Sequence, residues 1–111
     1  MIYSELVSES LNKTLMKEGF VYILTNKNKT VLYVGATGNL KNRVKEHISG
    51  KGSVFTRKYK SYYLVYFEKI AKYEDAFKRE KQIKNWKNEW KWNLIKSKNP
   101  DLKNLYLDLL E

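Results

Sequence analysis

Apolar and polar residues occur in blocks near the start of the chain, and the pattern predicts a β-hairpin. An apolar block, a polar turn and a second apolar block lie at residues 20–24, 25–30 and 31–35. Two short runs of β-forming residues that flank a polar turn are typical of antiparallel strands. A symmetric closure pairs Leu24 with Val31 and sets Tyr22 opposite Tyr33. Because side chains alternate along a strand, both phenol rings are then expected on one face.

A helix is predicted directly after the hairpin, over residues 40–48. The Gly38-Asn39 pair can end the second strand, and asparagine is a favoured helix N-cap. Arg43 and His47 are four residues apart, so they share one side of this helix. They border the predicted apolar stripe, which consists of Leu40, Val44 and Ile48. We therefore expect Arg43 and His47 to face the two tyrosines.

The remaining pattern predicts a third strand and three further helices. The strand is expected at residues 61–67, and the helices at 73–83, 86–97 and 102–110. A loop is expected at residues 49–53 and a connector at 68–72. The predicted fold is therefore α/β in the α+β sense, a small three-stranded antiparallel sheet flanked by helices.

One carboxylate interrupts an apolar helix face. In the helix that starts at Tyr73, Glu80 lies on the same side as the apolar residues Ala76, Phe77 and Ile83. A carboxylate in such a stripe is tolerated when it is paired or bound to a ligand. Two interpretations stay open, namely an ion pair with Arg43 or a lysine, and a metal ligand.

The chain divides into a terminal extension and one domain. Residues 1–18 have roughly helical apolar spacing and are interpreted as an N-terminal helical extension, whereas residues 19–111 form the domain. The extension can pack on the domain, mediate self-association or be a frayed start. With 111 residues, the chain has room for one modest core.

The charge balance points to a polyanionic partner. The chain has 22 Lys+Arg against 12 Asp+Glu, which gives a formal net charge of +10. Such an excess favours nucleic acid, although a general preference for lysine could also explain it. Arginine is rare and occurs at Arg43, Arg57 and Arg79, where its planar fork can bind phosphate in a bidentate manner.

Other features of the composition exclude several classes. The chain has no cysteine, which excludes disulfides and thiolate metal sites. The sequence has no apolar run long enough to cross a membrane and no signal-peptide pattern, so we expect a cytoplasmic protein without membrane contact.

A segment of interleaved basic and aromatic residues follows the predicted loop. Arg57 and Lys58 lie between Phe55 and Tyr59. This pattern suits a contact with a nucleic-acid backbone, and it equally suits a solvated face whose aromatic rings point inward.

Together these motifs resemble the GIY-YIG nuclease superfamily, in particular its small stand-alone bacterial members. The resemblance rests on Tyr22, on Tyr33-Val34-Gly35, on Arg43 and His47, and on the segment around Glu80. It covers about residues 19–106. One departure is that Phe20 stands where the family name has glycine.

The resemblance implies a metal-dependent endonuclease that hydrolyses DNA, in duplex or branched form, with DNA repair and recombination both left open as its role. Glu80 would bind one Mg²⁺ or Mn²⁺ ion, Arg43 would hold the phosphate, and His47 would take or relay a proton. Either Tyr22 or Tyr33 would act as the base, since a nearby cation and a metal favour the phenolate. Gly35 would allow close passage of the backbone, and an expected asparagine is assigned to Asn99, with Asn93 as the alternative.

Two other function classes stay open. A non-catalytic nucleic-acid-binding module could keep the same scaffold and charge, and a basic RNA-binding protein could share the motifs by coincidence. The choice of the DNA site that is cut could come from a protein partner or from a homo-oligomer. The presence of Tyr22, Tyr33, Arg43 and Glu80 together favours the enzyme, because a binding module could lose any of them.

Overall fold

The computed structural model describes residues 17–110, and a three-stranded antiparallel sheet lies at their centre. Its strands are β1 (Gly19–Thr25), β2 (Leu32–Thr37) and β3 (Tyr63–Ile70), in the order β2-β1-β3. The central strand β1 is buried at almost every position, which explains why its sequence is continuously apolar and does not alternate. The predicted sheet and its α+β class are confirmed.

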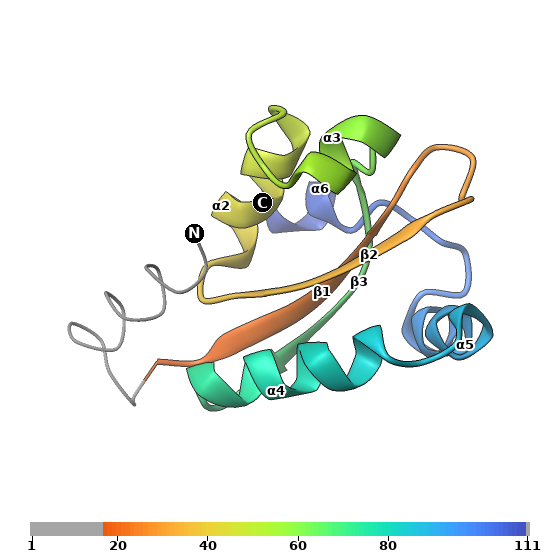
Figure 1. The fold of residues 1–111 in the computed structure, drawn as a ribbon. Helices are drawn as coiled ribbons and strands as arrows, with labels where there is room; N and C mark the ends of the chain where they lie inside the picture. Colours follow the sequence, from red (N-terminus) through yellow and green to blue (C-terminus); the bar gives the residue numbers. More distant parts are fainter. Residues whose placement is uncertain (1–16, 111) are drawn as a thin grey trace.

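Helices cover both faces of the sheet (Figure 1). One face carries α2 (Leu40–Ile48), α3 (Val54–Tyr59) and α6 (Tyr106–Leu109), and the other carries α4 (Tyr73–Lys84) and α5 (Asn88–Lys98). This three-layer arrangement produces two separate cores, one on each side of the sheet.

The two cores divide the apolar side chains of the sheet. The α4 and α5 side contains Val21, Ile23, Val34, Ala36, Val65, Tyr66, Ala76, Ile83 and Ile95. The α2 and α6 side contains Tyr22, Leu24, Leu40, Val44 and Leu64. Successive residues of β1 therefore belong to opposite cores, and Tyr22 is directed towards α2.

The hairpin register differs from the symmetric prediction. Leu24 pairs with Tyr33, and Tyr22 lies opposite Gly35. The shift is two residues, so Tyr22 and Tyr33 stay on one face as predicted, because side chains alternate with a period of two. The turn keeps its predicted length of six residues but lies one position later, at residues 26–31. Asn26 organises it, because its side-chain oxygen accepts from the backbone N–H groups of Thr30 and Val31 at 2.8 and 3.2 Å.

Several boundaries also differ from the prediction. Residues 54–59 form the helix α3, the third strand extends to Ile70, and the closing helix is only four residues long. In α2, the predicted N-cap is confirmed, since the side chain of Asn39 accepts from the N–H of Asn42 at 3.1 Å. Ile48, however, is 38% exposed, and His47 is buried in its place beside Val44.

The N-terminal helix predicted for residues 1–18 lies almost wholly outside the described residues. The described part begins at Lys17, whose carbonyl accepts from the N–H of Tyr73 at 2.9 Å. Within residues 17–110, no helix is long and apolar enough to cross a membrane.

Candidate active site

Three of the predicted site residues form an aromatic cluster between β1, β2 and α2. The ring centroids of Tyr22 and Tyr33 are 6.3 Å apart, and the His47 ring is 5.8 Å from Tyr22 and 5.3 Å from Tyr33. Tyr22 and His47 are almost fully buried, whereas Tyr33 is partly exposed. The sheet and α2 thus bring together residues that are up to 25 positions apart in the sequence.

Gly35 creates the space for the Tyr22 side chain. It lies opposite Tyr22 in the hairpin, and a Cβ atom at this position would overlap the hydroxyl end of the phenol ring. Gly35 was predicted to allow a close approach, and the group that comes close to its backbone is the Tyr22 side chain. A larger residue would displace Tyr22.

A chain of hydrogen bonds connects Tyr22 to α3 through His47. The Tyr22 hydroxyl is 2.9 Å from Nε2 of His47, and Nδ1 of His47 is 2.9 Å from Oγ1 of Thr56. Thr56 also donates to the carbonyl of Ser53 at 3.1 Å. Because a threonine hydroxyl has one proton, Nδ1 of His47 must donate to Thr56 if all these contacts are hydrogen bonds. Nε2 then carries the lone pair and accepts from Tyr22.

Thr56, Ser53 and Gly52 are site residues that the sequence reasoning missed. Thr56 is fully buried, and its N–H donates to the side chain of Ser53 at 3.1 Å, which makes Ser53 the N-cap of α3. A Cβ atom on Gly52 would overlap the imidazole of His47, so the loop packs tightly against the ring. The signal in the sequence was Ser53 followed by Thr56, a pattern typical of a helix N-terminus.

Arg43 lies beside the aromatic cluster and forms an ion pair with a residue of its own helix. Its Nε is 3.0 Å from a carboxylate oxygen of Glu46, and the Arg43 side chain is 22% exposed. Arg43 is close enough to the Tyr22 phenol to offset part of the rise in its pKa that burial causes. The guanidinium is therefore positioned next to the phenol with one edge already bound by a carboxylate.

A cavity of about 270 Å³ opens onto these groups. It is lined by Tyr33, Arg43, Glu46, His47, Lys51, Gly52 and Ser53. Tyr22 lies behind this cavity, with its hydroxyl on His47. The cavity can thus hold a phosphate next to a guanidinium, an imidazole and a phenol, which are groups used for charge stabilisation and proton transfer.

Burial sets the protonation of the two innermost groups. The pKa of the Tyr22 phenol is raised above its usual value by burial and by Tyr33, and Arg43 only partly offsets this rise. Arg43 alone therefore does not make Tyr22 a phenolate, and the expectation that a cation and a metal together favour a phenolate stays a prediction. Burial and the charge of Arg43 lower the pKa of His47 to about 4, so the imidazole is neutral at pH 7.

Glu80 lies on α4, in the helical layer on the other face of the sheet. Its side chain is 12% exposed, and its carboxylate is 2.6 Å from Nζ of Lys84, which is 49% exposed. The ion pair with a lysine, one of the two expected alternatives, is thus present. The charge of Glu80 still raises the pKa of Tyr22, so the carboxylate acts across the sheet on the candidate site.

Glu80 is the residue that the sequence predicts as the metal ligand. No cluster of three or more His, Cys, Asp or Glu side chains suited to a metal occurs among residues 17–110. Mg²⁺ commonly binds through one or two carboxylates and completes its shell with water and substrate phosphate. Glu80 offers such a carboxylate, and the Lys84 ammonium that pairs with it is half exposed.

The other predicted residues lie apart from this cluster. Asn99 is buried, and its side chain binds the backbone of Val65 and Lys103 with three bonds of 2.9 to 3.0 Å, so its amide holds the chain after α5. Nε of Arg79 donates to the Glu68 carboxylate at 2.7 Å, so this guanidinium binds a carboxylate of the protein itself. Arg57 and Lys58 are exposed on the last turn of α3.

Comparison with known proteins identifies relatives along most of the chain. A family model described as the GIY-YIG catalytic domain matches residues 18–93. The UPF0213 protein of Syntrophus aciditrophicus (strain SB) is 40% identical over 87 residues, which cover 78% of this chain and 98% of the relative. The UPF0213 protein of Clostridium perfringens (strain 13 / Type A) is 42% identical over 79 residues, covering 71% and 84%.

A solved structure resembles the fold. The solution NMR structure of a UPF0213 protein from Bacillus halodurans superposes with a TM-score of 0.51 and 31% sequence identity. The match covers 78% of this chain and 92% of that chain. The names of these relatives state no activity.

Proposed function

The chain belongs to the GIY-YIG family, a family of nucleases, and from this premise we propose that it is a divalent-metal-dependent endonuclease that hydrolyses DNA phosphodiester bonds. The observation that carries the proposal is the hydrogen bond between the Tyr22 hydroxyl and Nε2 of a neutral, buried His47. A binding module needs no proton acceptor behind its phosphate site, whereas hydrolysis does.

Each group of the cluster has a chemical role in this reaction. Arg43 binds the non-bridging oxygens of the phosphate and stabilises the charge that builds up on them. As the water oxygen bonds to phosphorus and the bond to the leaving sugar oxygen breaks, Tyr22 takes a proton from the water while its own proton passes to Nε2 of His47. The leaving oxygen takes a proton from solvent. This relay needs no free phenolate, which agrees with the raised pKa of Tyr22.

Thr56 positions His47 for the relay. It accepts from Nδ1–H, fixes the tautomer with the lone pair on Nε2, and stabilises the imidazolium that the proton transfer creates. Tyr33 lines the cavity and is placed to hydrogen-bond to the substrate. Glu80 is the residue that would hold the metal ion, which when bound adds positive charge at the phosphate.

The test is a nicking assay on supercoiled plasmid with Mg²⁺ or Mn²⁺, with branched DNA alongside. Tyr22→Phe keeps the ring and removes the hydroxyl, so the rate should fall by about 10²- to 10⁴-fold, the usual contribution of acid–base catalysis. Tyr33→Phe should lose less activity. The matched control is Tyr66→Phe, which removes another buried phenol, on the opposite face of the sheet, and should keep nicking.

Two outcomes would change the assignment. A larger loss with Tyr33→Phe than with Tyr22→Phe would make Tyr33 the proton acceptor. Unchanged nicking in both variants would remove the relay, and DNA binding without any cleavage under all metal conditions would leave a non-catalytic binding module.

A further inference from the structure

Aromatic rings continue from the candidate active site onto α3. The Tyr33 ring is 5.9 Å from Phe55, and Phe55 is 4.8 Å from Tyr59, measured between ring centroids. The row therefore begins at the candidate active-site cavity and ends at the last residue of α3. None of the mechanistic roles given above uses the outer end of this row.

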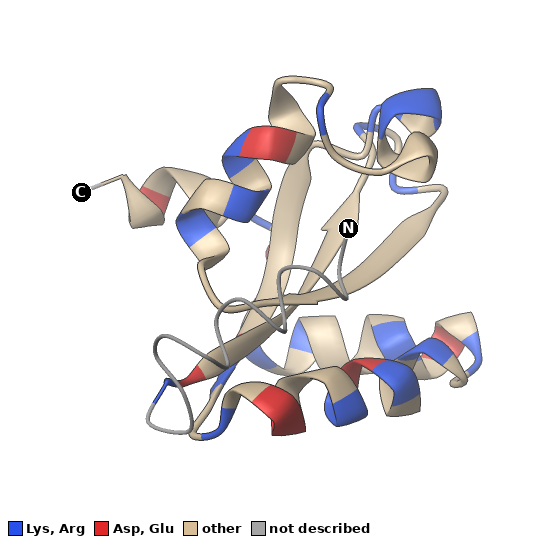
Figure 2. Ribbon diagram, turned by 60° about the vertical axis from the view of Figure 1, so that its left-hand side comes forward, with Lys and Arg blue, Asp and Glu red and all other residues tan. Residues whose placement is uncertain are grey.

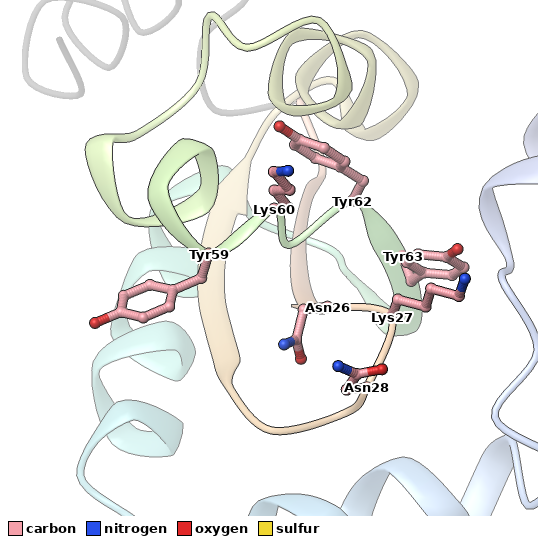
Figure 3. Close-up of a pocket in the computed structure, with 7 residues that line it drawn as sticks. All are labelled: Asn26, Lys27, Asn28, Tyr59, Lys60, Tyr62 and Tyr63. Atoms are coloured by element: carbon pink, nitrogen blue, oxygen red, sulfur yellow. The ribbon is translucent and has the colours of Figure 1, made fainter.

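A second cavity lies at that outer end. It has a volume of about 350 Å³ and is lined by Asn26, Lys27, Asn28, Tyr59, Lys60, Tyr62 and Tyr63 (Figure 3). In Figure 3, Tyr59 and Tyr63 stand on opposite sides, with Lys60 and Asn26 between them. The lining comes from the β1–β2 turn, the end of α3 with the residues that follow it, and the start of β3, so three segments of the chain meet there.

The lining combines exposed rings with positive charge. Tyr59 is 41% exposed and Tyr63 is 39% exposed, so each presents a large aromatic surface to solvent. Lys27 and Lys60 line the cavity and no carboxylate does. Within the described part of the chain, the side chain of Asn28 makes no hydrogen bond, whereas the oxygen of Asn26 is used inside the turn.

Lys60 adopts a backbone conformation that is uncommon for lysine. It follows α3 with φ 52° and ψ 48°, in the left-handed region where glycine is favoured at the end of a helix. The cavity therefore carries a cation at a position where glycine would fit the backbone better. The Lys60 side chain thus adds positive charge to the cavity lining at a position whose backbone glycine could also adopt.

We propose that this cavity binds an unpaired base of the nucleic-acid strand that is cut at the neighbouring site. This inference rests on the proposed function. Tyrosine rings stack on a base of any identity, lysines bind the flanking phosphates, and the Asn28 amide can bond a base edge. Bases inside an intact duplex are stacked on one another and offer no face to Tyr59 or Tyr63. The enzyme should accordingly prefer strands with an unpaired segment.

Binding is measured with the full chain in EDTA, which separates it from cleavage. The probes are a short fluorescein-labelled single strand, its duplex, and an abasic strand of the same length, followed by fluorescence anisotropy. Tyr63→Leu and Tyr59→Leu should each weaken binding of the natural single strand by about 5- to 100-fold, the range for loss of one stacked base. Their affinity for the abasic strand should stay unchanged.

Conservative and remote variants control for folding and for general effects. Tyr63→Phe and Tyr59→Phe keep the aromatic face and should bind like the parent protein. Trp90→Leu removes a ring that is 53% exposed on α5 and does not line the cavity, and should also bind like the parent. Two results would overturn the base-binding cavity. One is a loss of affinity in Trp90→Leu as large as in the tyrosine-to-leucine variants, and the other is a loss in those variants that is equal for natural and abasic strands.

Lys60→Gly separates the phosphate contact from the stacking contact. Glycine suits the left-handed backbone, so the variant should melt at the same or a higher temperature while binding natural and abasic strands about equally less well. Lys78→Ala removes the same charge from α4, where the lysine is 80% exposed, and should reduce binding less. Equal effects of the two lysine variants would show that only net charge matters and would overturn the contact assigned to Lys60.

The nicking assay makes the two proposals fail separately. If the Leu variants lose single-strand affinity and neither the parent protein nor any variant nicks DNA, base binding in the cavity is supported and the nuclease activity is refuted. Nicking by the parent protein, together with unchanged single-strand affinity in the Leu variants, keeps the nuclease and overturns the cavity.

Discussion

At the scale of single residues, Arg43 is distinguished from the other arginines by what surrounds it. Arg79 is bound by Glu68 within the fold, and Arg57 is exposed on α3. Only Arg43 borders both the Tyr22 phenol and the cavity. Its ion pair with Glu46 is partly solvated and contributes little to stability, about 1 kcal/mol at most.

We therefore predict that Arg43→Ala affects cleavage much more than folding. Nicking should fall by about 10²- to 10³-fold, as for the loss of one transition-state donor, while the melting temperature changes little. Arg43→Lys should recover little activity, since a point charge cannot replace the fork. Glu46→Gln is the control, because it removes the ion pair but keeps the guanidinium. A melt that shows unfolding of Arg43→Ala would mean that the arginine is structural.

The buried imidazole predicts a pH dependence of stability. The pKa of His47 is lowered to about 4 from its usual 6.5, so below about pH 6.5 the unfolded chain binds a proton that the folded chain does not. The free energy of unfolding should thus fall as the pH drops from about 6.5 to 4, by at most about 3 kcal/mol. His47 is the single histidine of the sequence, so an NMR titration of its ring signals measures this pKa directly.

The variant His47→Gln isolates the contribution of that imidazole. Its stability curve should be flatter than the parent's in the same pH window, since the carboxylates titrate in both proteins. An NMR pKa near 6.5 for His47 would contradict both the stability prediction and the neutral acceptor in the proposed relay.

At the scale of elements, the sequence predicted what depends on local patterns. The strands, α2 with its Asn39 cap, and α4 follow from β-forming runs, helix caps and helical spacing. The shared face of Tyr22 and Tyr33 was also predictable, because the register error was an even number of residues.

What the sequence did not predict depends on contacts between elements. The helix α3 has only six residues, which is too few for a helical period to be recognised in the sequence. It nevertheless carries Thr56, which hydrogen-bonds to His47. His47 is buried in place of Ile48 because the Tyr22 hydroxyl and Thr56 hydrogen-bond to its polar ring inside the core. The ion pair of Glu80 with Lys84 was foreseen only as one of two alternatives.

The helix α4 offers a test of that alternative. Because Lys84 is half exposed, Glu80→Gln leaves a solvated ammonium behind and should cost well under the several kcal/mol expected for a buried pair. If Glu80 holds the metal, nicking and the Mg²⁺- or Mn²⁺-dependent shift of the melting temperature should both be lost. DNA binding in EDTA should survive or tighten, since a negative charge has been removed.

Glu74→Gln is the matched control for this variant. Glu74 is exposed in the first turn of the same helix, so its neutralisation removes the same charge away from the site. Full nicking by a stably folded Glu80→Gln protein would refute the metal-ligand role and leave the carboxylate as a partner of Lys84 alone.

At the scale of the whole molecule, positive charge is spread over both helical layers. Lysine and arginine segments occur on helices on both sides of the sheet, and acidic segments are fewer (Figure 2). Among residues 17–110, positive charge is therefore not confined to one face of the sheet. Such a field attracts nucleic acid from many directions, and local contacts must decide which face binds.

The final prediction separates the general field from the local contacts. Duplex binding should weaken as salt rises, with a slope of log K on log salt of about −0.9 per phosphate contacted. Arg57→Ala and Lys58→Ala, on the exposed last turn of α3 beside the candidate site, should each reduce the slope by about one contact. Lys78→Ala, on α4, should change it less, although the net charge falls by the same amount. Measurement of anisotropy at several salt concentrations checks all three variants. Equal slopes for the three would mean that duplex DNA responds to net charge alone, and the α3 face would lose its role as the binding surface.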